Sequence, residues 1–323
     1  MSQNKSRPLI TFALTAYNQE MYIKQAIEGA FSQTYSPLEI ILSDDCSSDN
    51  SFDIMKKLAG TYEGPHIIIL NRNENNLGIA GHWNKILDLA NGKYVVFADG
   101  DDISLQDRAL KSWEILEKNP DCTYLNFSTI NFTDEYQIGE MKKKGDYSLR
   151  KFSLFDLFKD SKFPIGGATT IVKSIFQLFG HLLNDTPTQD STIQLRYLLK
   201  GPILKSTEPG IFYRIHGNNF SASDNKYLID YDKIYLQYMT DLRKALSLGF
   251  VDNNIYKLVC IALEKELFRK KIWLKFNRQN RKLIIFISSI LFSRHFSQKE
   301  KKKYFIQACK STLKNVAQFL RLR

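Results

Sequence analysis

Apolar residues in the first half of the chain follow two alternating patterns. Short continuous runs, such as residues 38–42 and 94–97, have the length and composition of buried strands. Between them lie segments in which apolar residues recur every three or four positions, which is the spacing of one helix face. We expect strands over residues 9–14, 38–42, 66–70, 94–97 and 122–127, and helices over residues 21–31, 52–58, 80–90 and 106–117. This alternation with short connections predicts an α/β fold around a mostly parallel, doubly wound sheet.

The alternation ends near residue 131. Residues 133–150 are polar and rich in lysine, and we expect them to form an exposed loop. Beyond them we expect a strand over 165–172 that is entered through a turn at Gly166 and Gly167, a helix over 190–199, a strand over 211–215, and helices from about residue 226 onward. The sequence therefore predicts an α/β domain over residues 1–222 and a helical C-terminal region over residues 223–323.

The net charge of +11 is concentrated toward the C-terminal end. Residues 265–323 contain 17 Lys or Arg and two Glu, a net charge of +15, which leaves −4 for the rest of the chain. In the same region Phe305, Cys309 and Leu313 recur at helical spacing, so an apolar stripe accompanies the basic residues. This combination favours an anionic membrane surface as a partner over nucleic acid, for which no recognition fold is evident. The alternative is a helical appendix that packs on the domain or on a second copy of the chain, as in a homo-oligomer.

The four cysteines lie far apart and form no Cys-x-x-Cys pair. This spacing argues against a zinc site or a disulfide framework and is typical of a reducing cytosol. Residues 1–8 are polar and precede no long apolar core, so we expect no signal peptide. The longest apolar run, residues 283–292, is shorter than the ~20 residues that span a bilayer. We therefore expect a cytoplasmic protein that is peripheral on the inner face of the cell membrane.

Two acidic clusters directly follow predicted strands. The first contains Asp44, Asp45 and Asp49, and the second is Asp99-Gly100-Asp101-Asp102. In an open α/β sheet, ligands bind at the carboxyl ends of the strands. Carboxylates crowded there repel one another unless a cation or a ligand compensates their charge. The pattern therefore predicts a divalent metal site and a phosphorylated substrate.

Four motifs together resemble those of the family 2 glycosyltransferases, which have the GT-A fold. They are Thr15-Ala16-Tyr17-Asn18-Gln19-Glu20, Asp44-Asp45-Cys46-Ser47-Ser48-Asp49, Asn76-Leu77-Gly78 and Asp99-Gly100-Asp101-Asp102. The resemblance covers roughly residues 8–220, with the motifs in the family's order. Cys46 departs from the pattern, because glycine is commonest at its position. The resemblance implies an inverting, metal-dependent enzyme that moves a sugar from a nucleoside-diphosphate sugar to a carbohydrate or lipid-linked acceptor in bacterial surface polysaccharide synthesis.

The resemblance also implies a donor site. Its expected members are Thr15, Ala16, Tyr17, Glu20, Asp44, Asp45, Asn76, Gly78, Asp99, Gly100 and Arg214. Tyr17 would stack on the base, and Asp44 would accept the N3–H of uracil or thymine, which favours a UDP- or dTDP-sugar. The expected ligands of Mn²⁺ or Mg²⁺ are Asp101, Asp99 and His216. Structural alternatives exist: Tyr17 and His216 could serve packing alone, and Ser47, Ser48 and Asp49 could cap the following helix.

The catalytic base implied by the resemblance is Asp190, at the start of a predicted helix. Gln189 stands before it where the family usually has glutamate, and Asp185 is the fallback. The alternative is that Asp190 only caps its helix. Gly166 and Gly167 are expected to shape the acceptor pocket. The remaining histidines are interpreted as structural; they are His66, His82, His181 and His295.

Two other functions compete with sugar transfer. A nucleotidyltransferase commonly has a glycine-rich loop with Arg or Lys after its first strand. Residues 15–20 contain no glycine and no Arg or Lys. A catalytically inactive nucleotide-sugar-binding module could be anchored by the basic tail. The presence of both Asp101 and Asp190 argues against that second alternative.

Overall fold

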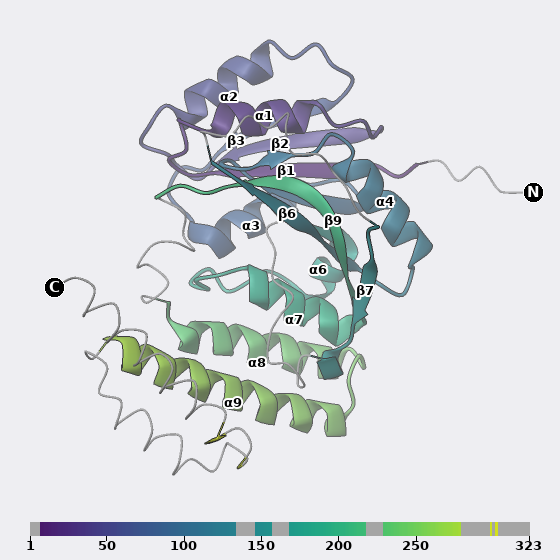
Figure 1. The fold of residues 1–323 in the computed structure, drawn as a ribbon, viewed down its shortest axis with the longest axis vertical. Helices are drawn as coiled ribbons and strands as arrows, with labels where there is room; N and C mark the ends of the chain where they lie inside the picture. The colour runs from purple at the N-terminus through teal and green to yellow at the C-terminus, as the bar shows by residue number, and fades with distance from the viewer. Residues whose placement is uncertain are drawn as a thin grey trace, which may run out of the picture.

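The protein folds around a single large sheet (Figure 1). The computed structural model describes residues 7–133, 146–156, 168–217, 229–278, 298 and 301–302. Over these residues the sheet has nine strands in the order β3-β2-β1-β4-β8-β6-β9-β5, and β7 also pairs with β9. The strands are β1 Ile10–Ala16, β2 Leu38–Asp44, β3 Ile67–Arg72, β4 Tyr94–Asp99, β5 Ile103–Ser104, β6 Tyr124–Phe132, β7 Leu149–Phe152, β8 Ala168–Val172 and β9 Ile203–Arg214.

The N-terminal half has the predicted alternation of strands and helices. Its helices are α1 Ile23–Phe31, α2 Ser51–Gly60, α3 Gly78–Leu89 and α4 Arg108–Lys118. Strands β3, β2, β1 and β4 are all parallel, so their carboxyl ends lie at one edge. The register pairs Ala16 with Asp44 and Thr15 with Asp99. Three of the four sequence motifs therefore begin side by side at that edge.

Beyond β4 the sheet is mixed rather than parallel. Strand β8 runs antiparallel to both β4 and β6, and β9 pairs with β6 in parallel and with β5 and β7 antiparallel. The strand expected over 211–215 is only the end of the twelve-residue β9, whose first part is interrupted by polar residues and Pro209. Strand β7 begins at the end of the segment expected to be a loop, and residues 134–145 of that segment lie outside the described residues.

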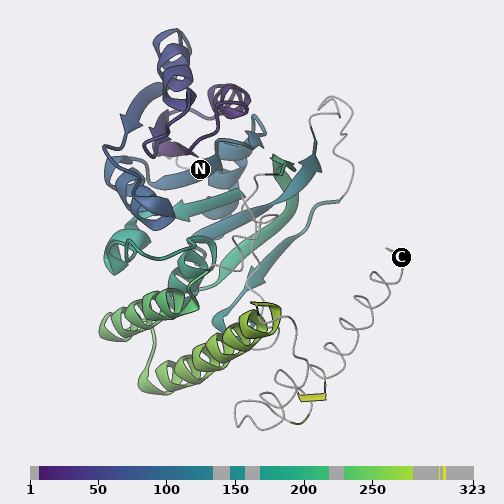
Figure 2. The ribbon, with the colours of Figure 1, turned by 90° about the vertical axis from the view of Figure 1, so that its left-hand side faces the viewer.

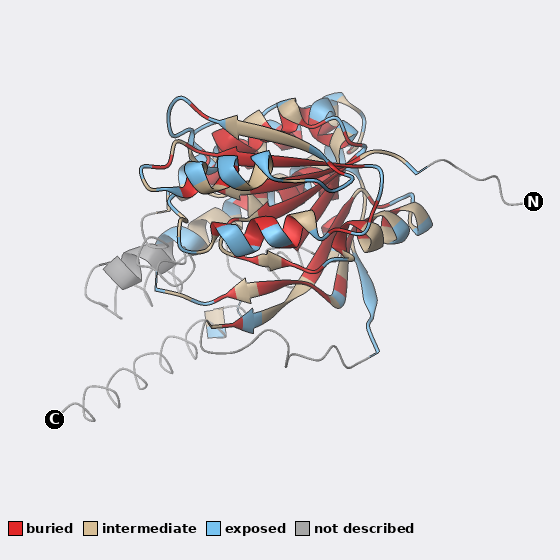
Figure 3. Cartoon of the chain, turned by 90° about the horizontal axis from the view of Figure 1, so that it is seen from above, coloured by how far each residue is buried: buried red, intermediate tan, exposed pale blue. Residues whose placement is uncertain are grey.

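Each central strand is buried on both faces, and its alternate side chains enter two different cores (Figure 3). Phe12, Leu14 and Ile40 pack with apolar residues of α1, α2 and α4. Ala13 and Ile41 pack on the other face with α3 and with the later helices. Burial of one such aliphatic or aromatic side chain contributes about 1.5–3 kcal/mol, so the two layers fix the sheet that carries the motifs.

The later helices cover the second face of the sheet. They are α6 Lys173–Phe179, α7 Asp190–Lys200, α8 Tyr231–Ser247 and α9 Asn253–Arg278. Tyr238 and Leu242 of α8 and Leu263 of α9 belong to the same apolar core as the sheet residues, and α9 lies along α8 (Figure 2). The predicted helical character is confirmed through residue 278, and most of residues 279–323 lie outside the description. Within the described part of the chain, no helix is both long enough and apolar enough to cross a membrane.

Candidate active site

The first, second and fourth motifs meet where β1, β2 and β4 end. The Asp45 N–H donates to the Ala16 carbonyl over 2.9 Å, and the Gly100 N–H donates to the Thr15 carbonyl over 2.8 Å. The Thr15 hydroxyl also donates to Asp99 Oδ1 over 3.2 Å. These bonds extend the strand pairing into the turns and hold the two acidic clusters at fixed positions relative to each other.

The loop after β1 is bound to the loop after β2. The Asn18 N–H donates to Ser47 Oγ over 2.9 Å, and its side-chain oxygen accepts the Ser48 N–H over 2.9 Å. Glu20 makes two such links: its N–H donates to Asp49 Oδ2 over 2.9 Å, and its carboxylate accepts Asn50 Nδ2 over 2.7 Å. Glu20 was predicted to contact the nucleotide-sugar donor. In the structure its carboxylate holds these two loops together.

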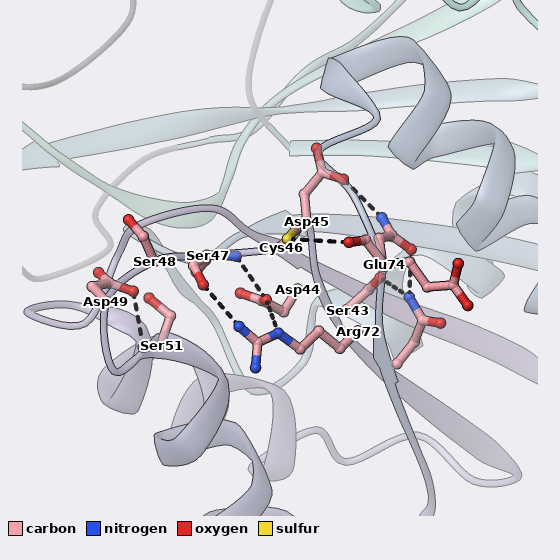
Figure 4. Close-up of polar contacts among 12 residues, drawn as sticks. Ser43, Asp44, Asp45, Cys46, Ser47, Ser48, Asp49, Ser51, Arg72 and Glu74 are labelled. Carbon is pink, nitrogen blue, oxygen red and sulfur yellow. Dashed lines mark hydrogen bonds and ion pairs between the residues drawn. The ribbon is translucent and has the colours of Figure 1, made fainter.

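Helix α2 begins too late along the chain for Ser47 or Ser48 to be its N-cap residue. It starts at Ser51, and the side chain of its N-cap residue Asn50 makes no capping hydrogen bond. The prediction that Ser47 and Ser48 cap this helix was therefore wrong, because Asn18 engages both serines instead. Asp49 is closer to the expected role, since its Oδ1 accepts the Ser51 N–H over 3.0 Å (Figure 4).

Asp44 is buried with one carboxylate oxygen left open. Its Oδ2 accepts the Ser47 N–H over 2.9 Å and lies 3.5 Å from Arg72 Nε (Figure 4). Its Oδ1 is buried and has no hydrogen-bond partner among the described residues. Such an oxygen is costly unless something donates to it. The ring of Tyr17, one residue beyond β1, is 49% exposed, so an aromatic surface is available at the same edge.

Arg72 is a member of this site that the motifs do not include. It ends β3, and its guanidinium donates to the Ser47 carbonyl over 2.9 Å and lies 5.0 Å from the Phe52 ring centroid. It follows a predicted strand of the same sheet. Because parallel strands end at one edge, that placement was a usable signal.

Asp45 and Asn76 shape the loop before α3. Asp45 Oδ1 accepts Asn73 Nδ2 over 2.8 Å and the Leu77 N–H over 2.9 Å. Asn76 Oδ1 accepts the Gly78 N–H over 3.0 Å, and Gly78 has a positive φ of 68°. Asp45 and Asn76, both predicted to contact the nucleotide-sugar donor, thus have defined protein partners in this loop.

Cys46 has a positive φ of 62°. This is the left-handed region, in which glycine is free of the Cβ penalty. A glycine at this position would therefore be free of that cost.

The turn after β4 concentrates negative charge. Burial, followed by the charges of Asp101 and Asp190, raises the pKa of Asp99 to about 7. Burial and the charges of Asp101 and Asp99 raise the pKa of Asp102 to about 8. A Cβ on Gly100 would lie 2.4 Å from Gln19 Oε1 and 2.8 Å from Ile23 Cδ1, so the turn is packed tightly against the protein. Such crowding is what a bound cation would relieve.

A buried arginine lies beneath this turn. Arg108, the first residue of α4, is fully buried and donates to Ser104 Oγ over 2.9 Å, to the Thr169 carbonyl over 3.3 Å and to the Phe97 carbonyl. Burial lowers its pKa to about 10, against the opposing effect of Asp99 and Asp102. Sequence reasoning missed Arg108, although its spacing of four from Ser112 places it on the buried face of the helix.

Two basic residues at the end of β9 reach the same turn. His216 Nε2 lies 3.1 Å from Asp101 Oδ2. The Arg214 N–H donates to Asp102 Oδ1 over 3.0 Å, and its Nε donates to the Asp101 carbonyl over 3.0 Å. The structure thus brings Asp99, Asp101, Arg214 and His216 together from motifs more than one hundred residues apart.

Asp190 lies in the same electrostatic environment. Its charge contributes to the raised pKa of Asp99, and burial raises its own pKa to about 6, although the residue as a whole is only partly buried. Helix α7 begins at Asp190, its N-cap residue is Gln189, and no side-chain hydrogen bond caps it, so Asp190 is not the cap. Among the described residues, no hydrogen-bond partner occupies its carboxylate. Asp185, the fallback, is exposed and lies 3.2 Å from Lys233 Nζ.

The other described histidines each contact a protein group. His66 Nε2 lies 2.9 Å from the Gln33 carbonyl, His82 Nε2 lies 2.7 Å from Ser43 Oγ, and the exposed His181 lies 2.8 Å from Asp88. Burial lowers the pKa of both His66 and His82. His295, Gly166 and Gly167 lie outside the described residues.

The carboxylates of the turn after β4 suit a cation that is also coordinated by a bound ligand. In the described ranges, no three His, Cys, Asp or Glu side chains are grouped so that they could hold a metal ion. Mg²⁺ in phosphate chemistry commonly takes only one or two protein carboxylates and completes its shell with phosphate oxygens and water. Asp101 and Asp99 are residues of that kind, and the charge crowding of the turn fits the same role.

A family model described as glycosyl transferase family 2 matches residues 11–178. The chain belongs to this family. Among curated family members it is similar to the putative teichuronic acid biosynthesis glycosyltransferase TuaG of Bacillus subtilis, with 34% identity over 110 residues, which cover 34% of this chain and 42% of TuaG. The chain spans between 40% and 44% of the length of the first three curated relatives.

Solved structures agree with the expected fold. S. aureus TarS 1-349 in complex with UDP-GlcNAc superimposes with a TM-score of 0.64 at 14% identity, covering 87% of this chain and 79% of TarS 1-349. The mannosyltransferase PcManGT from Pyrobaculum calidifontis, solved with GDP-Man and Mn²⁺, superimposes with a TM-score of 0.58 at 16% identity, covering 96% and 81%. At these identities the likeness establishes the fold alone, and the predicted GT-A fold with a helical C-terminal region is confirmed.

Proposed function

We propose that the protein is an inverting glycosyltransferase that moves a sugar from a nucleoside-diphosphate donor to a carbohydrate acceptor. The observation that carries this proposal is the meeting of Asp99, Asp101 and Asp190 in one charged environment at the ends of β4 and the start of α7. Two of these carboxylates come from the turn that suits a diphosphate and its cation. The third, Asp190, has no hydrogen-bond partner within the described ranges and suits a proton acceptor.

The donor diphosphate would bind between the acidic turn and the end of β9. Asp101 and Asp99 would hold Mn²⁺ or Mg²⁺, which would neutralise the charge that develops on the departing nucleoside diphosphate. Arg214 and His216 carry the donor groups that suit phosphate oxygens. The presence of Mn²⁺ and GDP-Man in the PcManGT structure supports this assignment.

Asp190 would remove the proton of the acceptor hydroxyl as its oxygen attacks the anomeric carbon. Attack from the side opposite the leaving diphosphate inverts the configuration of that carbon. A carboxylate with a pKa of about 6 is ionised at neutral pH and is a stronger base than an ordinary aspartate.

The nucleotide would be UDP or dTDP. The open Oδ1 of buried Asp44 can accept the N3–H that uracil and thymine share, and the exposed ring of Tyr17 can stack on the base. The UDP-GlcNAc bound to TarS supports this choice. Thr15, Ala16, Asp45, Asn76, Gly78 and Gly100 would complete the donor site as backbone and loop positions, together with Glu20.

The setting would be assembly of a bacterial surface polysaccharide, which the name of TuaG supports. The acceptor would then be a carbohydrate, including one linked to lipid, at the cytoplasmic face of the membrane. Residues 1–222 would be the catalytic domain, and the basic residues within 223–323 would contact anionic lipid.

A panel of nucleotide sugars, assayed with and without Mn²⁺, tests the proposal. Wild-type protein should release the nucleoside diphosphate from one donor, and Asp101→Ala and Asp190→Ala should each abolish transfer while the melting temperature is retained. A nucleotidyltransferase would instead release pyrophosphate from a nucleoside triphosphate. A binding module would bind a donor without any turnover, and full activity in either variant would remove that residue from the mechanism.

A further inference from the structure

Tyr22 contacts both basic side chains that reach the acidic turn. It stands at the N-cap of α1, outside the four motifs. The centroid of its ring lies 4.6 Å from that of His216, with an angle of 33° between the planes. The Arg214 guanidinium lies 4.9 Å from the Tyr22 ring centroid. One aromatic ring therefore serves as a common support for two residues of the proposed diphosphate site.

Arg214 is held from several sides. Its guanidinium also lies 4.5 Å from the Phe132 ring centroid, and it donates to Gln25 Oε1, one turn along α1 from Tyr22. A guanidinium stacked on aromatic faces loses little additional freedom when it binds a ligand, because its plane is already fixed. Removal of the Tyr22 ring would leave one face of Arg214 and one face of His216 unsupported.

His216 contacts both Tyr22 and the acidic turn. Its Nε2 lies 3.1 Å from Asp101 Oδ2, and its ring is also packed against Tyr22. The observed contacts of Tyr22 with both side chains are made by its ring. Contacts to the opposite end of the donor are separate, because no described contact links Tyr22 with Tyr17 or Asp44.

We propose that Tyr22 is a positioning residue whose ring holds Arg214 and His216 in place for the diphosphate of the donor. This proposal rests on the proposed function, since it assumes that a nucleoside diphosphate binds at the Asp101 turn. It assigns to the first turn of α1 a role in phosphate binding without direct contact to the ligand. Loss of the ring should therefore weaken binding of the diphosphate part and leave binding of the nucleoside part unchanged.

The test compares two ligands in three proteins. Wild type, Tyr22→Phe and Tyr22→Leu are titrated with UDP plus Mn²⁺ and with uridine alone, with dTDP and GDP and their nucleosides as parallel probes. For the nucleotide that wild type binds best, Tyr22→Leu should weaken diphosphate binding by about tenfold and leave nucleoside binding unchanged. Tyr22→Phe should stay within about twofold of wild type for both, because it keeps the ring.

Tyr62→Leu is the matched control. Tyr62 is a partly exposed tyrosine that packs on the other end of α1, at 4.3 Å from the Phe31 ring centroid, and it also stacks on a histidine, His66. This control should bind both ligands as wild type does. Unchanged diphosphate binding in Tyr22→Leu, or an equal loss of both ligands, would overturn the positioning role. Absence of Mn²⁺-dependent diphosphate binding in wild type would instead overturn the proposed function on which that role depends.

Discussion

The aspartates of this site differ in what surrounds each of them. Asp44 is buried, and its Oδ1 has no hydrogen-bond partner among the described residues. Asp101 is paired with His216, and Asp190 is the first residue of α7. A carboxylate with an unfilled acceptor position suits a ligand N–H or a proton, whereas one in a crowd of like charges suits a cation. The surroundings of each aspartate thus assign it a different proposed role: base recognition for Asp44, metal binding for Asp101 and proton removal for Asp190.

The pH dependence of transfer should report Asp190. Because its folded-state pKa is raised to about 6 and a base must be ionised, kcat/KM should fall as the pH decreases through about 6. Initial rates between pH 5 and 8 with saturating Mn²⁺ would measure this limb. Asp190→Asn, which keeps the shape of the side chain, should lose at least about 100-fold in kcat. A flat profile together with an active Asn variant would exclude Asp190 as the base.

The conformation of Cys46 predicts the effect of two substitutions. Its positive φ costs an L-residue about 1–2 kcal/mol, so Cys46→Gly should unfold at a urea concentration no lower than wild type. Cys46→Val places a β-branched side chain in the same conformation and should lower the free energy of unfolding by about 1 kcal/mol or more. If the glycine variant were the less stable of the two, the backbone strain at this position would not be real.

The sequence motifs located most of the charged site, because they lie at strand ends that a parallel sheet brings together. They did not reveal Tyr22, Arg72 or Arg108. Tyr22 contacts Arg214, and Arg108 donates to the Thr169 carbonyl; both partners lie more than 60 positions away, and such long-range contacts leave no local pattern. Capping by Ser47 and Ser48 was predicted wrongly for a similar reason, since Asn18 of a different loop engages them.

At the scale of elements, the sequence patterns identified the first four strands and helices and placed strands within β6, β8 and the end of β9, but they missed β5, β7 and the first part of β9. Strand β9 contains Pro209 and several polar residues, and its pairing with β6 includes register shifts, so it has no clean period. The later helices were recognised because their apolar spacing is regular. Their arrangement depends on a buried ion pair, in which Arg196 of α7 donates to both oxygens of Asp241 of α8 over 2.9 and 3.1 Å.

This ion pair should be costly to break on one side only. Both side chains are almost fully buried, so Asp241→Leu leaves an uncompensated guanidinium and should lower the free energy of unfolding by about 3–5 kcal/mol. The double variant Arg196→Met/Asp241→Leu should lose less than the single variant. Urea denaturation would measure both. Glu28→Leu, which breaks the exposed Lys24–Glu28 pair, should change stability by less than about 1 kcal/mol. Additive losses in the double variant would contradict a direct coupling.

At the scale of the whole molecule, the boundary of the basic region does not coincide with the boundary of the apolar core. The apolar core is shared by the sheet, α8 and α9, whereas the excess of positive charge is confined to residues 265–323. A basic region attached to a near-neutral body is the distribution that attracts an anionic surface.

Binding to lipid vesicles tests the role of this charge. The protein should sediment with vesicles that contain phosphatidylserine and not with phosphatidylcholine vesicles, because each Lys or Arg near the surface contributes about 1 kcal/mol. Raising the salt concentration should release it by screening. Equal binding to both vesicle types would contradict an electrostatic anchor, and salt-independent self-association in sedimentation velocity would point to a second copy of the chain instead.

The central claim is that Asp99 and Asp101, at the end of β4 and in the turn after it, bind a nucleoside diphosphate through a shared divalent cation. Calorimetric titration of UDP, with and without Mn²⁺, into wild type and Asp101→Asn tests it most directly. Mn²⁺ should tighten UDP binding to wild type by at least about tenfold, and this gain should disappear in the variant while uridine binding persists. UDP affinity that is independent of Mn²⁺ in wild type, or an undiminished gain in Asp101→Asn, would contradict the account.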